Sequence, residues 1–493
     1  MVLFVFMTKI EKALTPTSII LLGATGDLAY KKLLPALISL FEKGVLPEYF
    51  YILAFSRDEK TNDEYRMFVR KSIEASKKQY GDALIDSFLE KIEYTQGVFE
   101  DSDAYERVKK KLEDNDNKIG MCSSKMFYLA VPPKFYETIF DKLAQVKLEQ
   151  ACLVGGGWTR ILVEKPFGSD YNNAKKLDDI LCSLFKEEQI YRIDHYLAKD
   201  ALQNIMAFRF SNVLFEDEWN NNYVEGVCIK VHENFDVKNR GAFFDGVGAL
   251  RDVGQNHILQ MLALIAMERP NELNATSLRE KRAQILEDVQ IPTSEQLGKT
   301  VIKGQYTGYR KVEDVAPESK TETYFAIKAF INNKRWKGVP FYLEHGKALQ
   351  DSKVEITLRF RSSKNCVCNG GENHNHPNFV RFTISPEQKI TLRFWVRKPG
   401  LKYELEAKDL VFDRSETKHE DETTDAYEEV LFDGICGDQT LFVSNREQKA
   451  AWKFVTAILD MWKDIEPTLY EKGSHGPDSI FKEEIIKNGN LFT

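Results

Sequence analysis

Ser18-Ile-Ile-Leu-Leu22, followed by Gly23-Ala-Thr-Gly26-Asp-Leu-Ala29, decides the fold predicted for the first part of this 493-residue chain. The apolar run is typical of a buried strand, and leucines at 33, 34, 37 and 40 recur with the period of a helix. A strand, a glycine turn and a helix in this order indicate a dinucleotide-binding domain, because glycines allow a pyrophosphate to approach the helix N-terminus. The spacing G-x-x-G-x-x-A differs from the usual G-x-G-x-x-G, so the pattern by itself is equally compatible with a simple turn.

A second predicted strand, residues 51–55, ends in Ser56-Arg57 and not in an acidic residue. An acid here would accept a hydrogen bond from the adenosine ribose, whereas an arginine pairs with a 2′-phosphate. Arg57 therefore favours NADP over NAD. Asp58 and Glu59 follow directly and leave NAD open, because either carboxylate could reach a 2′-hydroxyl.

Two further predicted strands, residues 125–131 and 160–163, end in Pro132-Pro133 and in Glu164-Lys165-Pro166. Nucleotide sites form at the carboxyl ends of parallel strands, so Lys165 can donate both to a sugar hydroxyl and to the nicotinamide amide. A simple lysine at a strand end is an equally good interpretation of this stretch alone. Residues 62–116 are charged and helical in pattern, and we expect crossover helices with solvated faces there.

The stretch Tyr191-Arg-Ile-Asp-His-Tyr-Leu-Ala-Lys199 holds an acid, an imidazole, a phenol and an ammonium group within six residues. If a helix follows Asp194, then His195 and Lys199 lie on one face and can donate to the same anion, as a phosphorylated substrate would require. Asp194 could instead orient an imidazole from elsewhere in the fold. The alternative is a charged helix start with Asp194 as its N-cap.

The second part of the chain changes character. Residues 226–233 alternate apolar and polar side chains and end at Glu233, as in a half-exposed strand of an antiparallel sheet. Further on, Arg251-Asp252-Val-Gly-Gln-Asn256-His257 precedes an apolar helix that ends near Met267. On a helix Asp252 and His257 lie at a partial angle, so both could reach one pocket from its rim. A lone histidine on an apolar helix is more often part of the core.

The composition excludes several classes of protein. A net charge of −7 and a pI near 5.8 give no general attraction to nucleic acid. Seven cysteines, an odd number, argue against a disulfide framework, and no apolar run reaches the length of a bilayer span. The apolar first six residues lack the basic region of a signal peptide, so we expect a cytoplasmic protein.

One loop holds residues of the types that ligate metals. Cys366, Cys368, His374 and His376 could together hold zinc. The glycine-containing loop between the two pairs is more simply interpreted as a hairpin tip, and we expect no metal.

The motifs together resemble one family. Arg192-Ile-Asp-His-Tyr-Leu-Ala-Lys199 is similar to R-I-D-H-Y-L-G-K, the substrate signature of glucose-6-phosphate dehydrogenases. E-K-P-F-G at residues 164–168, R-D-V-x-Q-N-H at 251–257 and R-W-x-G-V-P-F…G-K-A-L at 335–349 also resemble this family, from about residue 19 to 477. The resemblance implies an α/β Rossmann-like, doubly wound dinucleotide-binding domain over residues 1–192. Residues 193–493 would form a β+α domain with a large, mostly antiparallel sheet for substrate binding and oligomerisation.

The resemblance also implies a role for each matching residue. His257 would be the general base and Asp194 would orient it. The substrate would contact Lys165, His195, Tyr196, Lys199, Glu233, Asp252 and Lys347. The cofactor would contact Gly23, Ala24, Thr25, Gly26, Asp27, Leu28, Arg57, Tyr136 and Lys165.

The implied reaction transfers hydride from C1 of β-D-glucose 6-phosphate to NADP, giving 6-phospho-D-glucono-1,5-lactone, as in the first oxidative step of the pentose phosphate pathway. The implied partners are glucose 6-phosphate and other copies of the chain, in a homodimer or homotetramer, with neither nucleic acid nor membrane.

Some positions depart from the family pattern, namely Tyr30, Ala198, Ser352 and Ser385. A second, structural NADP held by some members would find only Lys353 and Arg393 basic, where this chain otherwise has Glu344, Thr357, Thr383 and His475, so we do not expect it. Two alternatives stay open. A different sugar oxidoreductase would share Gly23, Gly26 and Lys165 but not the phosphate cluster near His195, and an inactive relative would account for the departures.

Overall fold

The computed structural model describes residues 15–151, 157–363, 366, 376–414 and 425–477. The chain divides into two compact units, each of which contains segments that are distant in sequence. Unit 1 consists of Met1–Ala198, Glu272–Arg279 and Thr424–Asn445. Unit 2 consists of Lys199–Asn271, Glu280–Thr423 and Arg446–Thr493.

Unit 1 is built on a seven-stranded sheet with the order β15-β6-β5-β4-β1-β2-β3. Its strands are β1 (Thr17–Leu22), β2 (Phe50–Ser56), β3 (Ile92–Gln96), β4 (Ser124–Leu129), β5 (Thr159–Val163), β6 (Ile190–Ile193) and β15 (Phe442–Val443). All neighbours pair in parallel except β15, which pairs antiparallel with β6. The strand order reverses between β1 and β4, which is the position of ligand crevices in doubly wound sheets. The predicted fold of this part is confirmed.

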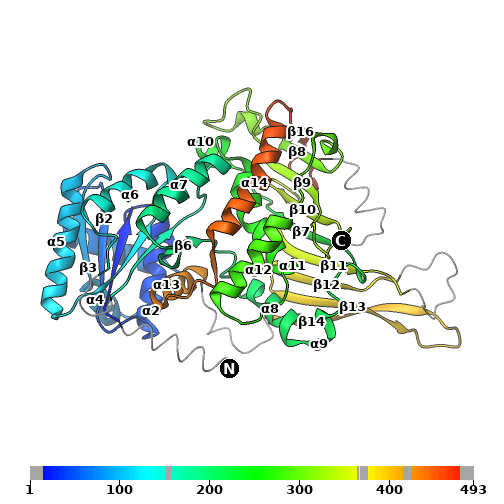
Figure 1. Cartoon of the computed structure of the whole chain (residues 1–493), viewed down its shortest axis with the longest axis horizontal. Helices are drawn as coiled ribbons and strands as arrows, with labels where there is room; N and C mark the ends of the chain where they lie inside the picture. The colour runs from blue at the N-terminus through cyan, green and yellow to red at the C-terminus, as the bar shows by residue number, and fades with distance from the viewer. Residues whose placement is uncertain (1–14, 152–156, 364–365, 367–375, 415–424, 478–493) are drawn as a thin grey trace. The chain divides into compact units, whose positions relative to one another are not determined.

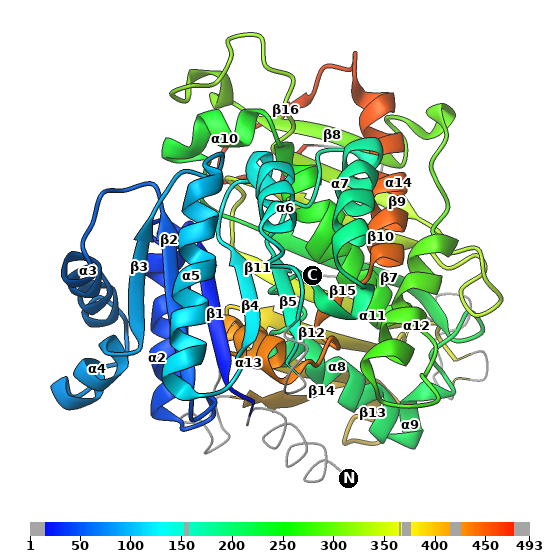
Figure 2. The same ribbon diagram turned by 60° about the vertical axis from the view of Figure 1, so that its left-hand side comes forward.

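Helices cover both faces of this sheet (Figures 1 and 2). One face packs on α2 (Leu34–Glu42), α3 (Asn62–Glu74), α4 (Asp82–Leu89) and α13 (Ala426–Cys436). The other packs on α5 (Ser102–Ile119), α6 (Tyr136–Gln145) and α7 (Tyr171–Leu184). Strand β3 interrupts the stretch that we expected to be wholly helical. Its buried residues Ile92 and Tyr94 alternate with a more exposed Glu93, so its apolar pattern is short and easily hidden among charged helices.

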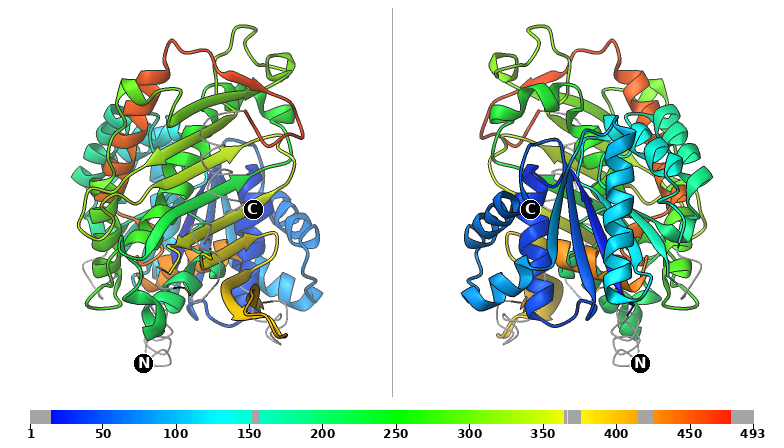
Figure 3. Two further views of the ribbon diagram at one scale, coloured as in Figure 1. Left: turned by 90° about the vertical axis from the view of Figure 1, so that its right-hand side faces the viewer. Right: turned by 90° about the vertical axis from the view of Figure 1, so that its left-hand side faces the viewer.

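Unit 2 contains a nine-stranded sheet with the order β14-β13-β12-β11-β7-β10-β9-β8-β16. The strands are β7 (Val224–His232), β8 (Val301–Tyr306), β9 (Tyr324–Ala329), β10 (Phe341–Gly346), β11 (Lys353–Phe360), β12 (Phe379–Ser385), β13 (Lys389–Arg397), β14 (Leu405–Asp413) and β16 (Thr468–Tyr470). Only β7 with β10 and β8 with β16 pair in parallel, so the expected mostly antiparallel sheet is confirmed. The left-hand view of Figure 3 shows its twist.

The helices of unit 2 include one unusual element, the nine-residue π-helix η5 (Leu250–Ile258), which continues directly into α11 (Leu259–Ala266). The others are α8 (Asp200–Ser211), α9 (Val213–Glu216), α10 (Gly241–Asp245) and α14 (Asn445–Trp462), and α12 (Ala275–Asp288) begins in unit 1. Helices η5 and α8 contact the strands of the sheet. Among the described residues no helix is long and apolar enough to cross a membrane.

The cysteines differ from the expectation at one position. Cys122 is disulfide-bonded, whereas Cys182, Cys228, Cys366 and Cys436 are thiols outside any disulfide. A disulfide at Cys122 departs from the expected set of reduced cysteines, although the described residues form no disulfide framework of the kind that staples small secreted domains.

Candidate active site

The glycine turn after β1 has the geometry that its sequence predicts. Gly23 has a φ of 87°, and a Cβ atom there would collide with the carbonyl oxygen of Ala130 beyond β4. Its N–H donates to the carbonyl of Phe55 at 2.9 Å, and the N–H of Gly26 donates to the carbonyl of Gly23 at 3.0 Å. The helix that leads into α2 opens at Asp27. Free backbone approach and a helix N-terminus therefore coincide at the switch point of the sheet.

The turn after β2 is joined to this glycine turn. The hydroxyl oxygens of Thr25 and Ser56 lie 2.7 Å apart. The hydroxyl of Tyr94 donates to the carbonyls of Ser56 at 3.1 Å and Asp58 at 2.5 Å, which holds the backbone on both sides of Arg57. The Arg57 side chain is exposed at the carboxyl end of β2, as a reader of a 2′-phosphate requires. These residues fit a phosphorylated dinucleotide.

Lys165 follows β5, and the residue before it is held firmly. The Glu164 carboxylate accepts a hydrogen bond of 2.5 Å from the Tyr128 hydroxyl, and the Glu164 carbonyl accepts one of 2.9 Å from the Tyr136 hydroxyl. Burial raises the pKa of Glu164. Tyr136 is completely buried among Phe140 and Phe167, so its ring supports the backbone next to Lys165 from within the core.

The segment after Asp194 is a turn, so our conditional expectation of a helix there is wrong. The Asp194 carboxylate accepts from the Tyr196 N–H at 3.0 Å, and its carbonyl accepts from the Leu197 N–H at 3.0 Å. An aspartate that bonds the backbone two residues on favours a turn over a helix. Helix α8 begins only at Asp200, with Lys199 as its N-cap residue. The division between the two units falls after Ala198, which places His195 in unit 1 and Lys199 in unit 2.

A buried ion network anchors this turn within unit 1. The Arg192 guanidinium lies 2.5 Å from Asp178 and 2.9 Å from Glu187. Arg279 reaches the same Glu187 at 2.7 Å. Arg192 lies two residues before Asp194, so the network fixes the strand end that carries Asp194 and His195. Sequence reasoning gave no role to Asp178, Glu187 and Arg279, because no motif joins them and Arg279 lies 92 residues from Glu187.

Three predicted substrate residues of unit 2 meet in one cluster. The Lys347 Nζ lies 2.5 Å from Glu233 Oε2 and 3.9 Å from Asp252 Oδ2. Glu233 and Lys347 directly follow β7 and β10, which are parallel neighbours. The Glu233 N–H donates to the Gly346 carbonyl at 3.0 Å, so the two strand ends are joined beyond the last paired residues.

Asp252 and His257 are carried by the π-helix η5, not by an α-helix. In a π-helix the backbone bonds run from residue i to i+5, so residues five apart lie on neighbouring turns. The Asn256 side chain donates to the Asp252 carbonyl at 3.0 Å and accepts from the His257 N–H at 2.6 Å. The imidazole of His257 is buried. We expected a partial angle between Asp252 and His257 on the assumption of an α-helix. The segment is a π-helix, so that calculation does not apply.

Two buried residues that sequence reasoning missed support this cluster. His345, two residues before Lys347, donates from Nδ1 to the Val231 carbonyl at 2.7 Å, and burial lowers its pKa to about 4. Glu322 accepts from the Leu250 N–H at 3.0 Å at the start of η5, and its carboxylate occupies the space that a side chain at Gly248, with a φ of 77°, would need. Only the strand register and the approach of a separate loop reveal these roles.

The positions considered for a second NADP are engaged with other protein groups. Glu344 accepts from the Tyr324 hydroxyl at 2.8 Å and lies 3.4 Å from His232. Arg393 donates twice to Asp409 at 2.8 Å. Of the candidate metal ligands, Cys366 Sγ lies 3.6 Å from His376 Nδ1, while Cys368 and His374 lie outside the described residues. No cluster of three metal-ligating side chains is found where the structure describes the chain.

Comparison with known proteins identifies the family. The model of "Glucose-6-phosphate dehydrogenase, NAD binding domain" matches residues 20–204, and that of "Glucose-6-phosphate dehydrogenase, C-terminal domain" matches residues 206–490. Glucose-6-phosphate 1-dehydrogenase of Borreliella burgdorferi is 36% identical over 487 residues, which cover 96% of this chain and 98% of that protein. Glucose-6-phosphate 1-dehydrogenase 5, cytoplasmic, of Arabidopsis thaliana is 36% identical over 479 residues, which cover 94% of this chain and 91% of that protein.

Solved structures agree with the sequence relatives. A structure described as glucose-6-phosphate dehydrogenase in complex with its substrate glucose-6-phosphate superposes with a TM-score of 0.88 at 31% identity, covering 97% of this chain and 99% of that one. The crystal structure of glucose-6-phosphate 1-dehydrogenase from Mycobacterium avium gives a TM-score of 0.82 at 30% identity, with 97% and 99% covered. The chain belongs to the glucose-6-phosphate dehydrogenase family.

Proposed function

We propose that this protein is a glucose-6-phosphate 1-dehydrogenase that oxidises β-D-glucose 6-phosphate at C1 and reduces NADP. The observation that carries the proposal is the cluster in unit 2. Lys347, Glu233 and Asp252 are suited to hold sugar hydroxyls, and η5 carries Asp252 and a histidine five residues apart. An ammonium group flanked by two carboxylates offers both donors and acceptors to a polyol, as a sugar ring requires.

In the proposed mechanism the unprotonated imidazole of His257 accepts the proton of the C1 hydroxyl. As the carbonyl forms, the C1–H bond breaks and both of its electrons leave with the hydrogen. Residues 23–28 and Arg57 would hold NADP, which would supply the acceptor for this hydride. The product is 6-phospho-D-glucono-1,5-lactone. A positioned general base of this kind contributes about 10²- to 10⁴-fold to the rate.

The remaining residues bind and orient. Asp194 would hold the His257 ring in the correct tautomer, and His195, Tyr196 and Lys199 would bind the substrate phosphate. Lys165 would contact both the sugar and the nicotinamide amide. Residues 23–28, Arg57 and Tyr136 would contact the dinucleotide, and the Tyr136 hydroxyl also donates to the Glu164 carbonyl next to Lys165.

The test of the reaction is the initial rate of nicotinamide reduction, followed by absorbance, with glucose 6-phosphate and either NADP or NAD. We expect strong preference for NADP, lost in Arg57→Ala. No reduction with either cofactor would contradict the proposed activity. Equal use of both cofactors would leave the activity standing and remove Arg57 from cofactor selection. Equal turnover of unphosphorylated glucose would instead favour a different sugar oxidoreductase.

We also propose that the protein pairs with further copies of itself, as a homodimer or homotetramer, through the outer strands of the large sheet. β14 forms the edge of this sheet, and its residues Leu410, Val411 and Phe412 are 59%, 53% and 49% exposed. Exposed apolar residues on an edge strand are unusual unless a partner covers them. Light scattering should give at least twice the chain mass, and Leu410→Asp with Phe412→Asp should reduce it to the monomer value. A wild-type monomer would contradict the proposal.

We place the protein in the cytoplasm, in line with two Arabidopsis thaliana relatives that are named cytoplasmic. A Solanum tuberosum relative is named chloroplastic. Fractionation of cells expressing the full chain would decide between these locations.

A further inference from the structure

The helix that follows His257 ends inside the protein. All eight residues of α11 are buried, and the next residue, Met267, is already extended with φ −60° and ψ 149°. The last four carbonyls of an α-helix have no partner within the helix and need other donors. The Met267 N–H donates to the Ala263 carbonyl at 2.9 Å. The carbonyls of Leu264, Ile265 and Ala266 are left for side chains, because water does not reach this helix end.

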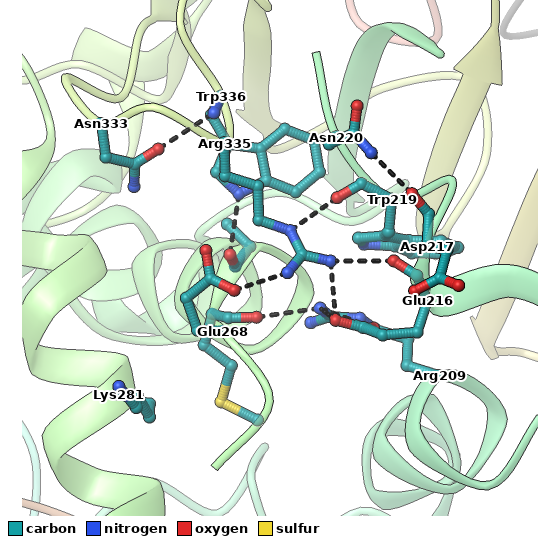
Figure 4. A network of polar contacts seen from close by, with 12 residues as sticks. Arg209, Glu216, Asp217, Trp219, Asn220, Glu268, Lys281, Asn333, Arg335 and Trp336 are labelled. Carbon is teal, nitrogen blue, oxygen red and sulfur yellow. Dashed lines mark hydrogen bonds and ion pairs between the residues drawn. The ribbon is translucent and has the colours of Figure 1, made fainter. Parts of the chain in front are cut away.

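Three buried side chains from separate segments supply these donors (Figure 4). Arg209 donates from Nη1 to the carbonyls of Leu264 and Ile265, both at 3.1 Å, and from Nη2 to that of Met267 at 2.8 Å. The indole N–H of Trp219 donates to Ile265 and that of Trp336 to Ala266, both at 2.8 Å. Every carbonyl of the last turn thus has a donor. We call Arg209, Trp219 and Trp336 the α11 clamp.

The clamp has a counterpart at the other end of the continuous helix. There the Glu322 carboxylate accepts from the Leu250 N–H at 3.0 Å, and the Glu322 carbonyl accepts from the Ala249 N–H at 2.9 Å. A carboxyl group at the N-terminus and a guanidinium at the C-terminus both complement the helix dipole. Both ends of the continuous helix formed by η5 and α11, which carries Asp252 and His257, are therefore held by buried groups.

We propose that the α11 clamp positions His257 for proton transfer by keeping η5 in its π-helical winding; this inference rests on the proposed dehydrogenase activity. A π-helix of nine residues is rare and is less favoured than an α-helix. If the C-terminal end of α11 were free to slide or turn, η5 could rewind as an α-helix. Residues five apart would then lie about 140° from each other around the axis, so His257 would turn relative to Asp252.

The sharpest variant is the double change Trp219→Phe with Trp336→Phe, which removes two donors and keeps the aromatic packing. Arg209→Met removes the other three hydrogen bonds to the helix end. Trp462→Phe is the matched control, because Trp462 is equally buried in unit 2 and its indole N–H has no hydrogen-bond partner among the described residues. Arg335→Met is the control for Arg209. Arg335 shares Glu216 with Arg209, and its acceptors in the described chain are Glu216, Glu268 and the backbone carbonyl of Trp219, not a carbonyl of α11; the indole N–H of Trp219 is left in place by this change.

We expect the tryptophan double variant to lower kcat about 3- to 30-fold and Arg209→Met up to about 100-fold, as a misplacement near 1 Å does. The substrate KM should change less than threefold. With substrate deuterated at C1, the isotope effect on kcat should rise in the clamp variants, because proton and hydride transfer become slower than product release. Both controls should keep kcat within about twofold, whatever their loss of Tm.

The isotope effect separates positioning from folding. A smaller fraction of folded enzyme lowers the apparent kcat without changing the isotope effect, and that result would overturn the proposal. If Arg209→Met does not fold, the isotope effect on kcat of the tryptophan double variant tests the proposal.

If the wild-type enzyme itself forms no NADPH, the proposed activity fails and amide hydrogen exchange decides the clamp. Faster exchange over residues 250–266 in the tryptophan double variant, compared with Trp462→Phe, supports the clamp. Unchanged exchange overturns it.

Discussion

The ammonium nitrogen of Lys347 lies 2.5 Å from the carboxylate of Glu233, although 114 residues separate them in sequence. Parallel pairing of β7 with β10 brings the two residues together at adjacent strand ends. The side chain of Lys347 is 8% exposed and that of Glu233 22% exposed, so water screens this pair only partly. Such a pair is costly to break from one side, because the remaining charge stays in a poorly solvated site.

We therefore expect Lys347→Met to destabilise the protein by about 1–3 kcal/mol, less than for a fully buried pair because Glu233 keeps some contact with water. Adding Glu233→Gln should restore most of that stability, because no charge is then left unpaired. Substrate KM should stay at least tenfold raised in the double variant, because the donor to the sugar is still missing. Urea unfolding and steady-state rates measure the two effects. Recovery of KM in the double variant would exclude Lys347 as a substrate ligand.

His257→Asn should lower kcat by about 10²- to 10⁴-fold with little change in substrate KM, because it removes a group required only in the transition state. Asparagine preserves a side chain of similar polarity in the buried position. Lys199→Ala serves as the comparison, since loss of a phosphate ligand should mainly raise the KM. Near-normal turnover by His257→Asn would show that another group accepts the proton.

Asn256→Ala should reduce kcat about 10- to 100-fold, because the side chain links the Asp252 carbonyl to the His257 N–H and so supports the π-helical winding. Gln260 is another buried polar residue on the same continuous helix, and its replacement in Gln260→Met should have much less effect on kcat. A crystal structure of Asn256→Ala should show residues 250–258 rewound as an α-helix. An intact π-helix with full activity would remove Asn256 from the mechanism.

The buried His345 predicts a pH dependence of stability. Burial lowers its pKa to about 4, compared with about 6.5 in an unfolded chain. As the pH falls through about 6.5 the unfolded chain takes up a proton that the folded protein refuses, so stability is present above this pH and is lost between about pH 6.5 and 4. The loss is on the order of a few kcal/mol.

His345→Gln should flatten this dependence while keeping a donor for the Val231 carbonyl. The difference in urea midpoint between wild type and variant, measured at pH 7.5 and at pH 5, isolates the contribution of His345 from that of the carboxylates. The same difference at both values would show that His345 titrates normally in the folded protein.

Local patterns predicted the parts of the molecule whose structure depends on neighbours in sequence. The turn at Gly23 needs only glycine at a positive φ and an apolar strand before it, and both can be read directly. Strand β3 was missed because five residues with charged neighbours carry little periodic signal. A helix after Asp194 was a conditional expectation, but the Asp194 side chain accepts from the Tyr196 N–H two residues on, and the segment forms a turn.

The candidate site was predicted residue by residue from its motifs, but its assembly was not. The sequence placed Glu233, Asp252 and Lys347 in one function, and strand pairing showed that three distant positions share one cluster. The supporting residues Asn256, His345 and Glu322 carry no motif of their own. Their roles depend on register, on burial and on which carbonyl lies within reach.

The sequence by itself predicted the doubly wound sheet of unit 1, the mostly antiparallel sheet of unit 2 and the residues proposed for the chemistry. Periodicity and glycine placement indicated a nucleotide-binding turn and a half-exposed antiparallel sheet, and the resemblance of the motifs to one family implied the two domains and the residue roles, because motifs are local properties of a chain. The tertiary structure alone decided the winding of η5 and the capping of α11. A π-helix is less favourable than an α-helix, and in the clamp proposed above the groups that hold this one, Glu322 at the start of η5 and Arg209 at the end of α11, come from elsewhere in the fold.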